Sequence, residues 1–271
     1  MKRLTCFLLA FLATASFSFE AEAYSVLTTS DGREVRWRQP VVYYYINPDG
    51  FEDFEVEELI RATTACFETW MEVHAGPEFV YAGTIDVKQP GDDCFNVIFF
   101  VQDPMEWMEM FHQEDETAMA MTRTYVDQSA RIVGFDLAFN DGHYDFTNTD
   151  DLNEVVTDYA NTLTHEIGHV LGLDHSDVPE AVMYPTAPEG EISKRTLSDD
   201  DRAGLRYLYR DPMPEPRYGC GAVEDPYCSD PGMSCHQGLE SRRPPRTPSS
   251  LLWALPVILV RLRRSRIRAS R

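Results

Sequence analysis

Three histidines and one glutamate lie close together in the sequence, at spacings that suit a metal site. His165 and His169 are four residues apart, so on a helix both imidazoles would project from one face and could bind one Zn²⁺. Gly172 can adopt the positive φ that ends a helix, and His175 can then return to the metal as the third ligand. Glu166 is a neighbour of the ligands rather than one of them, and would accept a proton from metal-bound water.

The combination of these residues is specific. The pattern H-E-x-x-H alone would arise by chance in about one chain in seventy of this composition, and far more rarely together with Gly172 and His175. A helix with two solvated or core histidines is the alternative interpretation, but it leaves the glycine and the third histidine unexplained. A catalytic zinc needs three protein ligands and one open position. We therefore expect one catalytic zinc, with Glu166 as the base.

The complete pattern H-E-x-x-H-x-x-G-x-x-H resembles that of the metzincin metalloproteases. Metzincins carry a methionine in a tight turn that underlies the three histidines without binding the metal, and Met183 is the candidate here; the alternative is an ordinary core methionine. Within the metzincins, Ser176 after the third histidine and the tripeptide Met183-Tyr184-Pro185 are similar to the matrixins, the matrix metalloproteinase family. Residues 197–209 are similar to the closing helix of that family, and the resemblance extends over about residues 35–210.

The resemblance implies an α+β, zincin-like catalytic domain over residues 24–210, with a mixed twisted sheet, an active-site helix and a C-terminal helix. It also implies a secreted or surface-exposed zinc endopeptidase that hydrolyses peptide bonds through a zinc-bound water activated by Glu166. Two alternatives stay open: a non-catalytic zinc-containing surface binding module, and a zinc hydrolase of small amides. Animal matrixins have a propeptide cysteine that blocks the zinc. No cysteine lies between Tyr24 and Gln39, so we expect a bacterial-type member without that switch.

Polypeptide substrates are expected to add a strand to the sheet edge near residues 118–124. The candidate substrate-binding residues on this edge are Ala118, Met119, Ala120 and Met121. The wall of the specificity pocket should include residues 184–187, with Tyr184 and Pro185 as contacts. A tyrosine that often follows the Met-Tyr-Pro turn in matrixins is replaced by Ala187, which leaves the side-chain preference open.

Further metal sites have weaker sequence support. The second, structural zinc of the family needs a His-x-Asp and two more upstream histidines, but beyond His143-Tyr144-Asp145 only the poorly placed His74 and His112 are available. We interpret these histidines, and His236, as surface or hydrogen-bonded residues. Acidic loops could bind Ca²⁺ through hard oxygen ligands, although a solvated acidic face is the interpretation we favour. The acidic residues concerned are Asp136, Asp141, Asp145, Asp150 and Asp151.

Hydrophobic periodicity predicts the elements that must position the site. Runs of β-branched and aromatic residues predict strands over 41–46, 79–81, 96–101, 117–126 and 132–139, and helical spacing predicts a helix over 56–71. An apolar stripe after Asp150 and Asp151 predicts the active-site helix; its members are Leu152, Val155, Val156, Tyr159 and Leu163. Ser198 and Asp201 form a capping-box pattern for a last helix that buries Leu205 and Leu208. We expect a mostly antiparallel or mixed sheet packed by helices.

Both ends of the chain are typical of targeting segments. Residues 1–23 combine a basic start, an apolar stretch and Ala21-Glu22-Ala23, which predicts a signal peptide rather than a buried helix, with Tyr24 as the mature N-terminus. Residues 211–250 form a Pro/Cys-rich and then Arg/Pro/Ser-rich linker. Residues 251–271 join a short apolar segment to an arginine cluster, which resembles a bacterial sorting tail. Its ten apolar residues are too few to span a bilayer, so any membrane or sorting-machinery contact would be transient.

Export would place the cysteines in an oxidising compartment, where disulfides persist. Five cysteines remain after residue 23, and the natural pairing is Cys66 with Cys94. Two of Cys220, Cys228 and Cys235 would form a second disulfide, leaving one thiol unpaired.

The charge distribution excludes one class of partner. The whole chain carries a net charge of −21, and residues 24–240 carry 13 basic and 43 acidic side chains, a net charge of −30. Such a surface repels phosphate backbones, so we expect no nucleic-acid binding. Solubility, cation binding or a preference for basic substrates remain as interpretations, and we expect a monomer. No run of about 20 apolar residues occurs, which excludes a transmembrane bundle.

Overall fold

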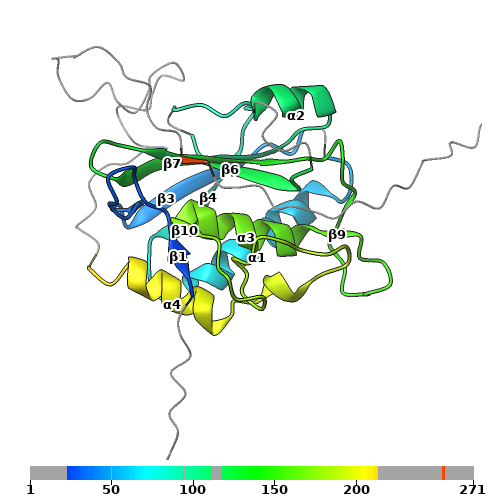
Figure 1. The fold of residues 1–271 in the computed structure, drawn as a ribbon. Helices are drawn as coiled ribbons and strands as arrows, with labels where there is room; N and C mark the ends of the chain where they lie inside the picture. The colour runs from blue at the N-terminus through cyan, green and yellow to red at the C-terminus, as the bar shows by residue number, and fades with distance from the viewer. Residues whose placement is uncertain (1–22, 50, 94, 112–116, 213–251, 254–271) are drawn as a thin grey trace, which may run out of the picture.

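The computed structural model describes residues 23–49, 51–93, 95–111, 117–212 and 252–253 (Figure 1). Most of the predicted signal peptide, the linker and most of the C-terminal tail therefore lie outside the described residues. Cys94, Cys220, Cys228, Cys235, His112 and His236 also lie outside them. Within these ranges, no helix combines the length and the apolar character that crossing a bilayer requires.

A mixed sheet forms the centre of the fold. Its strand order is β11-β6-β7-β5-β3-β4, with β2 also paired to β7. The pairs β3/β4, β3/β5, β5/β7 and β2/β7 are parallel, whereas β6 runs antiparallel to both β7 and β11. The strands are β2 (Arg36–Trp37), β3 (Val41–Ile46), β4 (Glu78–Thr84), β5 (Val97–Phe100), β6 (Ala120–Val126), β7 (Arg131–Phe139) and β11 (Leu252–Trp253). A mostly antiparallel or mixed sheet was predicted, and the sheet is mixed with most of its pairs parallel. The β3/β4 pair is parallel because a helix carries the chain from the end of β3 back to the start of β4.

Helices cover both faces of this sheet (Figure 1). Helices α1 (Val56–Met71) and α3 (Tyr159–Leu171) lie side by side against one face, and α4 (Asp199–Leu208) packs beyond them. The short helix α2 (Pro104–Met110) lies on the other face, where Trp107 packs against Val97 and Phe99. Alternate residues of β5 thus face opposite cores, as strand geometry requires.

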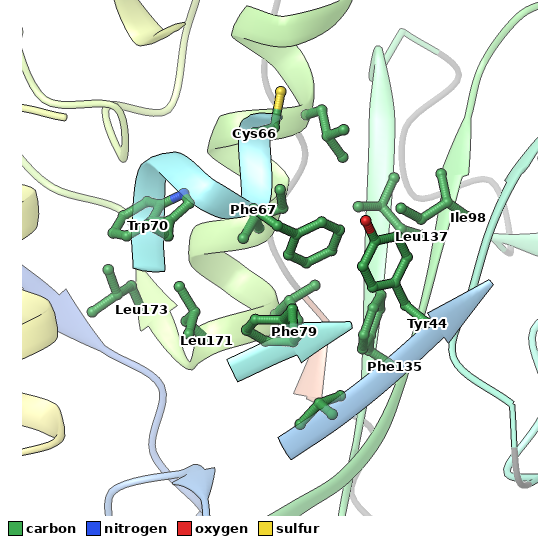
Figure 2. Close-up of a cluster of buried hydrophobic side chains, with 14 of the residues drawn as sticks. Tyr44, Cys66, Phe67, Trp70, Phe79, Ile98, Phe135, Leu137, Leu171 and Leu173 are labelled. Carbon is green, nitrogen blue, oxygen red and sulfur yellow. The ribbon is translucent and has the colours of Figure 1, made fainter. Parts of the chain in front are cut away.

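Aromatic side chains fill the space between α1 and the sheet. Figure 2 shows Phe67 of α1 between Tyr44 and Phe79, with ring centroids 4.3 and 4.8 Å away. Two buried tryptophans then attach this core to α3: Trp70 Nε1 donates to Thr164 O and Trp37 Nε1 to Val170 O, both at 2.8 Å. These two hydrogen bonds therefore hold α3 at a fixed position along the core.

Two short pairs of strands lie outside the central sheet in the part of the chain that the structure describes. Strand β1 (Ser25–Val26) pairs antiparallel with β10 (Leu173–Asp174), which follows α3 directly. Strand β8 (Phe146–Thr147) pairs in parallel with β9 (Thr157–Asp158), which leads into α3. The active-site helix is therefore held by a two-stranded pair at each end.

Several predicted elements are confirmed, but the strand predicted over 117–126 starts only at Ala120, and the predicted start of the active-site helix was wrong. The strand 41–46 and the helix 56–71 have the predicted bounds, and the capping box of Ser198 and Asp201 is present. The active-site helix, however, starts at Tyr159, with Asp158 as its N-cap, and not after Asp151. Leu152 is 64% exposed and Val156 40%, so they are not part of a buried stripe. Helix α2 was not predicted, although Asp103 followed by Pro104 is a favourable helix start.

The predicted disulfide between Cys66 and Cys94 was wrong, because Cys66 is a free, buried thiol. It lies on the face of α1 that packs against α3, and its Sγ contacts Ala160 O at 3.8 Å. Burial raises the pKa of this thiol to about 12, so it is an inert core group.

Candidate metal centre and active site

Helix α3 presents the first two histidines and ends where the third must return. Gly172 closes the helix in the left-handed conformation, with φ 98°, and its N–H is bonded within the last turn. A Cβ at this position would also lie 2.4 Å from Val35 O, so a side chain is excluded on two grounds. The chain then reverses into β10 and brings His175 back over the helix, as predicted.

The three imidazoles converge with their Nε2 atoms turned inward. His165 Nδ1 donates to Val182 O at 2.6 Å, and His169 Nδ1 donates to Leu173 O at 2.9 Å. These bonds leave Nε2 as the unprotonated nitrogen of both rings. In all three histidines Nε2 is buried and has no hydrogen-bond partner, and the three possible ligand atoms lie within 4.8 Å of one another. Buried polar atoms are rarely left unsatisfied, so this cluster fits a bound metal ion.

The electrostatics of the cluster suit the same ligand. Burial, together with the positive charge of Lys194, lowers the pKa of His165 well below its usual value, and burial lowers the pKa of His169 to about 3. Both rings are therefore neutral near pH 7, which is the form that binds metals. Three neutral imidazole nitrogens match the donor set of a catalytic zinc with one open position.

This is the only group of three or more metal-binding side chains that meets that distance within the described ranges. His143 and Asp145 do not form part of one. Two of the five acidic residues considered for Ca²⁺ have protein partners. Asp136 is 3% exposed and accepts hydrogen bonds from Gly91 N, Val97 N and Tyr125 OH, so the favoured interpretation of a solvated acidic face was wrong for this residue. Asp150 pairs with Arg195.

Glu166 lies beside the histidines, and a residue of the central sheet holds its side chain in place. Its side chain is 2% exposed, and its Oε2 accepts a hydrogen bond of 2.7 Å from Thr122 Oγ1 on β6. Burial raises the pKa of Glu166 to about 7, while the Thr122 hydroxyl and the Lys194 charge oppose that rise. Thr122 was not among the predicted site residues, because no local sequence pattern connects it to Glu166.

Met183 lies in a buried turn against the middle of α3. Its O accepts a hydrogen bond of 2.9 Å from Ser176 N. Asp201 of α4 accepts from Val182 N at 2.8 Å and from Met183 N at 3.0 Å. The same carboxylate also forms the capping box of α4, so the closing helix fixes the turn below the histidines.

A second carboxylate of α4 fixes the segment after the third histidine. Ser176 Oγ donates to Asp200 Oδ2 at 2.6 Å, and Asp200 Oδ1 accepts from the backbone amides of Ala23 and Tyr24 at 2.8 and 3.0 Å. The N-terminal segment, the closing helix and the neighbour of His175 thus meet at one side chain.

The comparisons with known proteins agree with this geometry. The sequence model of the matrixin family matches residues 36–210. The chain belongs to the matrixin family. It is 50% identical over 52 residues to metalloendoproteinase 2-MMP of Arabidopsis thaliana, which covers 19% of this chain and 14% of that protein. It is 52% identical over 46 residues to human matrilysin, covering 17% of each chain, and 54% identical over 54 residues to matrix metalloproteinase-9 of Canis lupus familiaris, covering 19% and 7%. The matches thus span less than a fifth of each of these relatives.

Membership confirms the fold class, an α+β metzincin domain. Matrixins are zinc metalloendopeptidases, which agrees with the three-histidine cluster.

The predicted substrate edge of this matrixin is only partly an edge. Strand β11 pairs with β6 at Arg123 and Thr124, so the outer side of β6 is covered there, and the prediction for the whole of 118–124 was wrong. Residues Ala118 to Met121 lie outside that pairing, and all four side chains are buried.

A cavity next to His165 is lined in part by the residues predicted for the wall of the specificity pocket. Its lining residues are Met119, Asn161, Thr162, His165, Ala187 and Lys194. Ala187 is therefore in the wall, whereas Tyr184 and Pro185 are not among the lining residues; both are half-buried, and Tyr184 O accepts a hydrogen bond from Lys194 Nζ. Lys194 was not among the predicted site residues, because a lysine in a polar loop is ordinarily a surface residue.

Proposed function

We propose that this matrixin is an exported zinc endopeptidase that hydrolyses peptide bonds in polypeptides. The observation that carries the proposal is the set of three buried, unpartnered Nε2 atoms next to the Glu166 carboxylate. His165, His169 and His175 would hold the metal. When bound, zinc supplies Lewis acidity: it lowers the pKa of water and polarises a carbonyl group.

Glu166 would handle the proton. In its ionised form Oε1 is free of the Thr122 bond and can accept a proton from the attacking water, and the same carboxyl group can then deliver that proton to the leaving amine. A pKa raised to about 7 suits both directions of transfer near neutral pH. The Thr122 bond restricts the carboxylate to one orientation during both transfers.

The polypeptide would bind in extended form along the start of β6 and the two residues before it, the stretch from Ala118 to Met121 that does not pair with β11. Backbone hydrogen bonds to a strand do not depend on the side chains of the substrate. Selectivity would then come from the cavity beside His165.

The test is peptide cleavage by the zinc-loaded full chain and by two variants. Glu166→Ala should keep the fold and the zinc but lose cleavage of casein or a quenched fluorescent peptide by about 10²–10⁴-fold. His175→Ala should lose zinc by elemental analysis. Normal turnover by Glu166→Ala would refute the role of the base, and a zinc-loaded wild type that cuts no polypeptide would favour a binding module or a small-amide hydrolase.

Export is a separate part of the proposal and has its own measurement. Protein recovered from outside the producing cell should begin at Tyr24 by N-terminal sequencing, since Ala21-Glu22-Ala23 fits a signal peptidase site. The intact mass of that protein would show whether residues 251–271 are removed as a sorting tail. Retention of residues 1–23 would contradict export through a cleaved signal peptide.

A further inference from the structure

Lys194 is a buried cation without an ion-pair partner. It lies in the 3₁₀ helix η1 (Ser193–Arg195) and is 3% exposed. Its Nζ donates one hydrogen bond, to Tyr184 O, although an ammonium group carries three N–H donors. No described carboxylate lies within 4.0 Å of Nζ. A buried charge is costly unless it is paired, so this lysine has unused capacity for an anion.

The three carboxylates whose charges act on Lys194 accept hydrogen bonds from other groups. Glu191 accepts from Ser193 Oγ, Glu166 from Thr122 Oγ1, and Asp201 from the Met183 turn and Ser198. Burial lowers the pKa of Lys194 to about 8, and the charges of these three carboxylates oppose that fall. The side chain is therefore still mainly protonated at pH 7.

The position of Lys194 connects it to the reaction centre. Lys194 and His165 line the same cavity, and the other lining residues, Met119, Asn161, Thr162 and Ala187, carry no charge. The Met183 turn holds both groups, since Val182 O binds His165 and Tyr184 O binds Lys194. The cation is thus fixed relative to the proposed metal ligand by backbone carbonyls two residues apart.

We propose that Lys194 makes this matrixin cleave next to an acidic residue. The free space in the cavity beside His165 is about 10 Å³, room for a single water molecule. The lining side chains would therefore move aside when a glutamate or aspartate adjacent to the scissile bond brings its carboxylate to the Lys194 ammonium. This inference rests on the proposed endopeptidase function. The overall charge opposes this preference, because the net charge of −30 on residues 24–240 repels acidic peptides at long range. The preference is therefore local, and added salt should lower the KM of acidic peptides.

The experiment uses quenched fluorescent peptides that differ at one position, Glu against Gln and Asp against Asn, on either side of the scissile bond. Zinc-loaded wild type should prefer one acidic peptide to its neutral partner by about tenfold or more in kcat/KM. Lys194→Met should reduce that ratio to about one, and Lys194→Arg should retain most of it. A purely structural lysine would affect both peptides of a pair equally and leave the ratio unchanged.

Lys88→Met is the matched control, because Lys88 is 40% exposed and pairs with Asp49 away from the cavity; it should keep the wild-type ratio. A second readout avoids turnover. In zinc-loaded Glu166→Ala, fluorescence anisotropy should show tighter binding of the acidic peptide, and the additional change Lys194→Met should remove the difference.

Cleavage with equal kcat/KM for every matched pair would overturn the role of Lys194 and leave the endopeptidase proposal standing. Absence of any cleavage would overturn both, so the two failures are distinguishable. If Lys194→Met does not fold, the wild-type ratio and Lys194→Arg still decide the question.

Discussion

Gly168 lies so close to Met183 that a Cβ at position 168 would be only 2.1 Å from Met183 Sδ. The same atom would lie 3.1 Å from Trp70 Cζ2. Glycine in the middle of a helix costs about 1 kcal/mol relative to alanine, so its presence here has a packing reason. This contact joins the helix that carries two of the histidines to the turn that supports them.

Gly168→Ala should therefore damage the site. The new methyl group would push the Met183 and Trp70 side chains away from α3, which would strain the turn that carries the Val182 carbonyl bonded to His165. Overpacking in a core typically costs 1–3 kcal/mol, which exceeds the gain of about 1 kcal/mol in helix propensity. We expect a lower Tm and lower zinc content by elemental analysis. Gly134→Ala is the control, since a Cβ there would meet its nearest atom at 3.4 Å, an ordinary contact. Wild-type zinc content in Gly168→Ala would show that the contact does not matter.

Thr122→Val should shift the acidic limb of the pH–activity profile upward. The Thr122 hydroxyl lowers the pKa of Glu166 by stabilising its carboxylate, so its removal raises that pKa further above its usual value. The base must be ionised to accept a proton, so more alkaline conditions would then be needed. Thr122→Ser retains the hydroxyl and should follow the wild type. The measurement is kcat/KM from pH 5 to 9, and superimposable profiles for all three proteins would refute the positioning role.

Metal removal should destabilise the fold. Without an ion, three buried Nε2 atoms lack partners, so zinc binds the native state far better than the unfolded chain. Free zinc at 100 times its Kd stabilises a protein by about 2.7 kcal/mol. Calorimetry with EDTA should show a lower Tm that added zinc restores, and Glu166→Ala should behave like the wild type. His169→Ala should lose the zinc-dependent shift, and a shift of wild-type size in that variant would argue against its role as a ligand.

Arg195→Ala should be strongly destabilising although the side chain is near the surface. Arg195 pairs with Asp158, whose side chain is fully buried and caps α3 through Asn161 N. Removing the arginine leaves a buried carboxylate unpaired, at a cost of about 3 kcal/mol. Arg131→Ala breaks a more exposed pair with Asp127 and should cost less than about 1 kcal/mol. Urea unfolding of both variants measures how much free energy of unfolding each one loses. Equal losses would contradict this account.

Local patterns predicted the elements whose residues interact with near neighbours in the chain. The helix 56–71 has a continuous apolar face, and the strand 41–46 is a run of β-branched and aromatic residues, so both boundaries were correct. The predicted start of α3 was wrong because a residue outside the helix determines which residue caps it. Arg195, far along the chain, pairs with Asp158 and so favours the cap at that residue.

The sequence by itself determined the histidine spacing, the adjacent glutamate, the terminal glycine and hence the family, because all of these depend on the geometry of one helix and one turn. Only the tertiary structure decided what surrounds them. Thr122 reaches Glu166 across 44 residues, Cys66 is turned away from disulfide formation by the packing of α1 on α3, and Lys194 is enclosed beside His165 without a counterion. Burial and unmet hydrogen bonds are properties of the packed chain, so no local pattern encodes them.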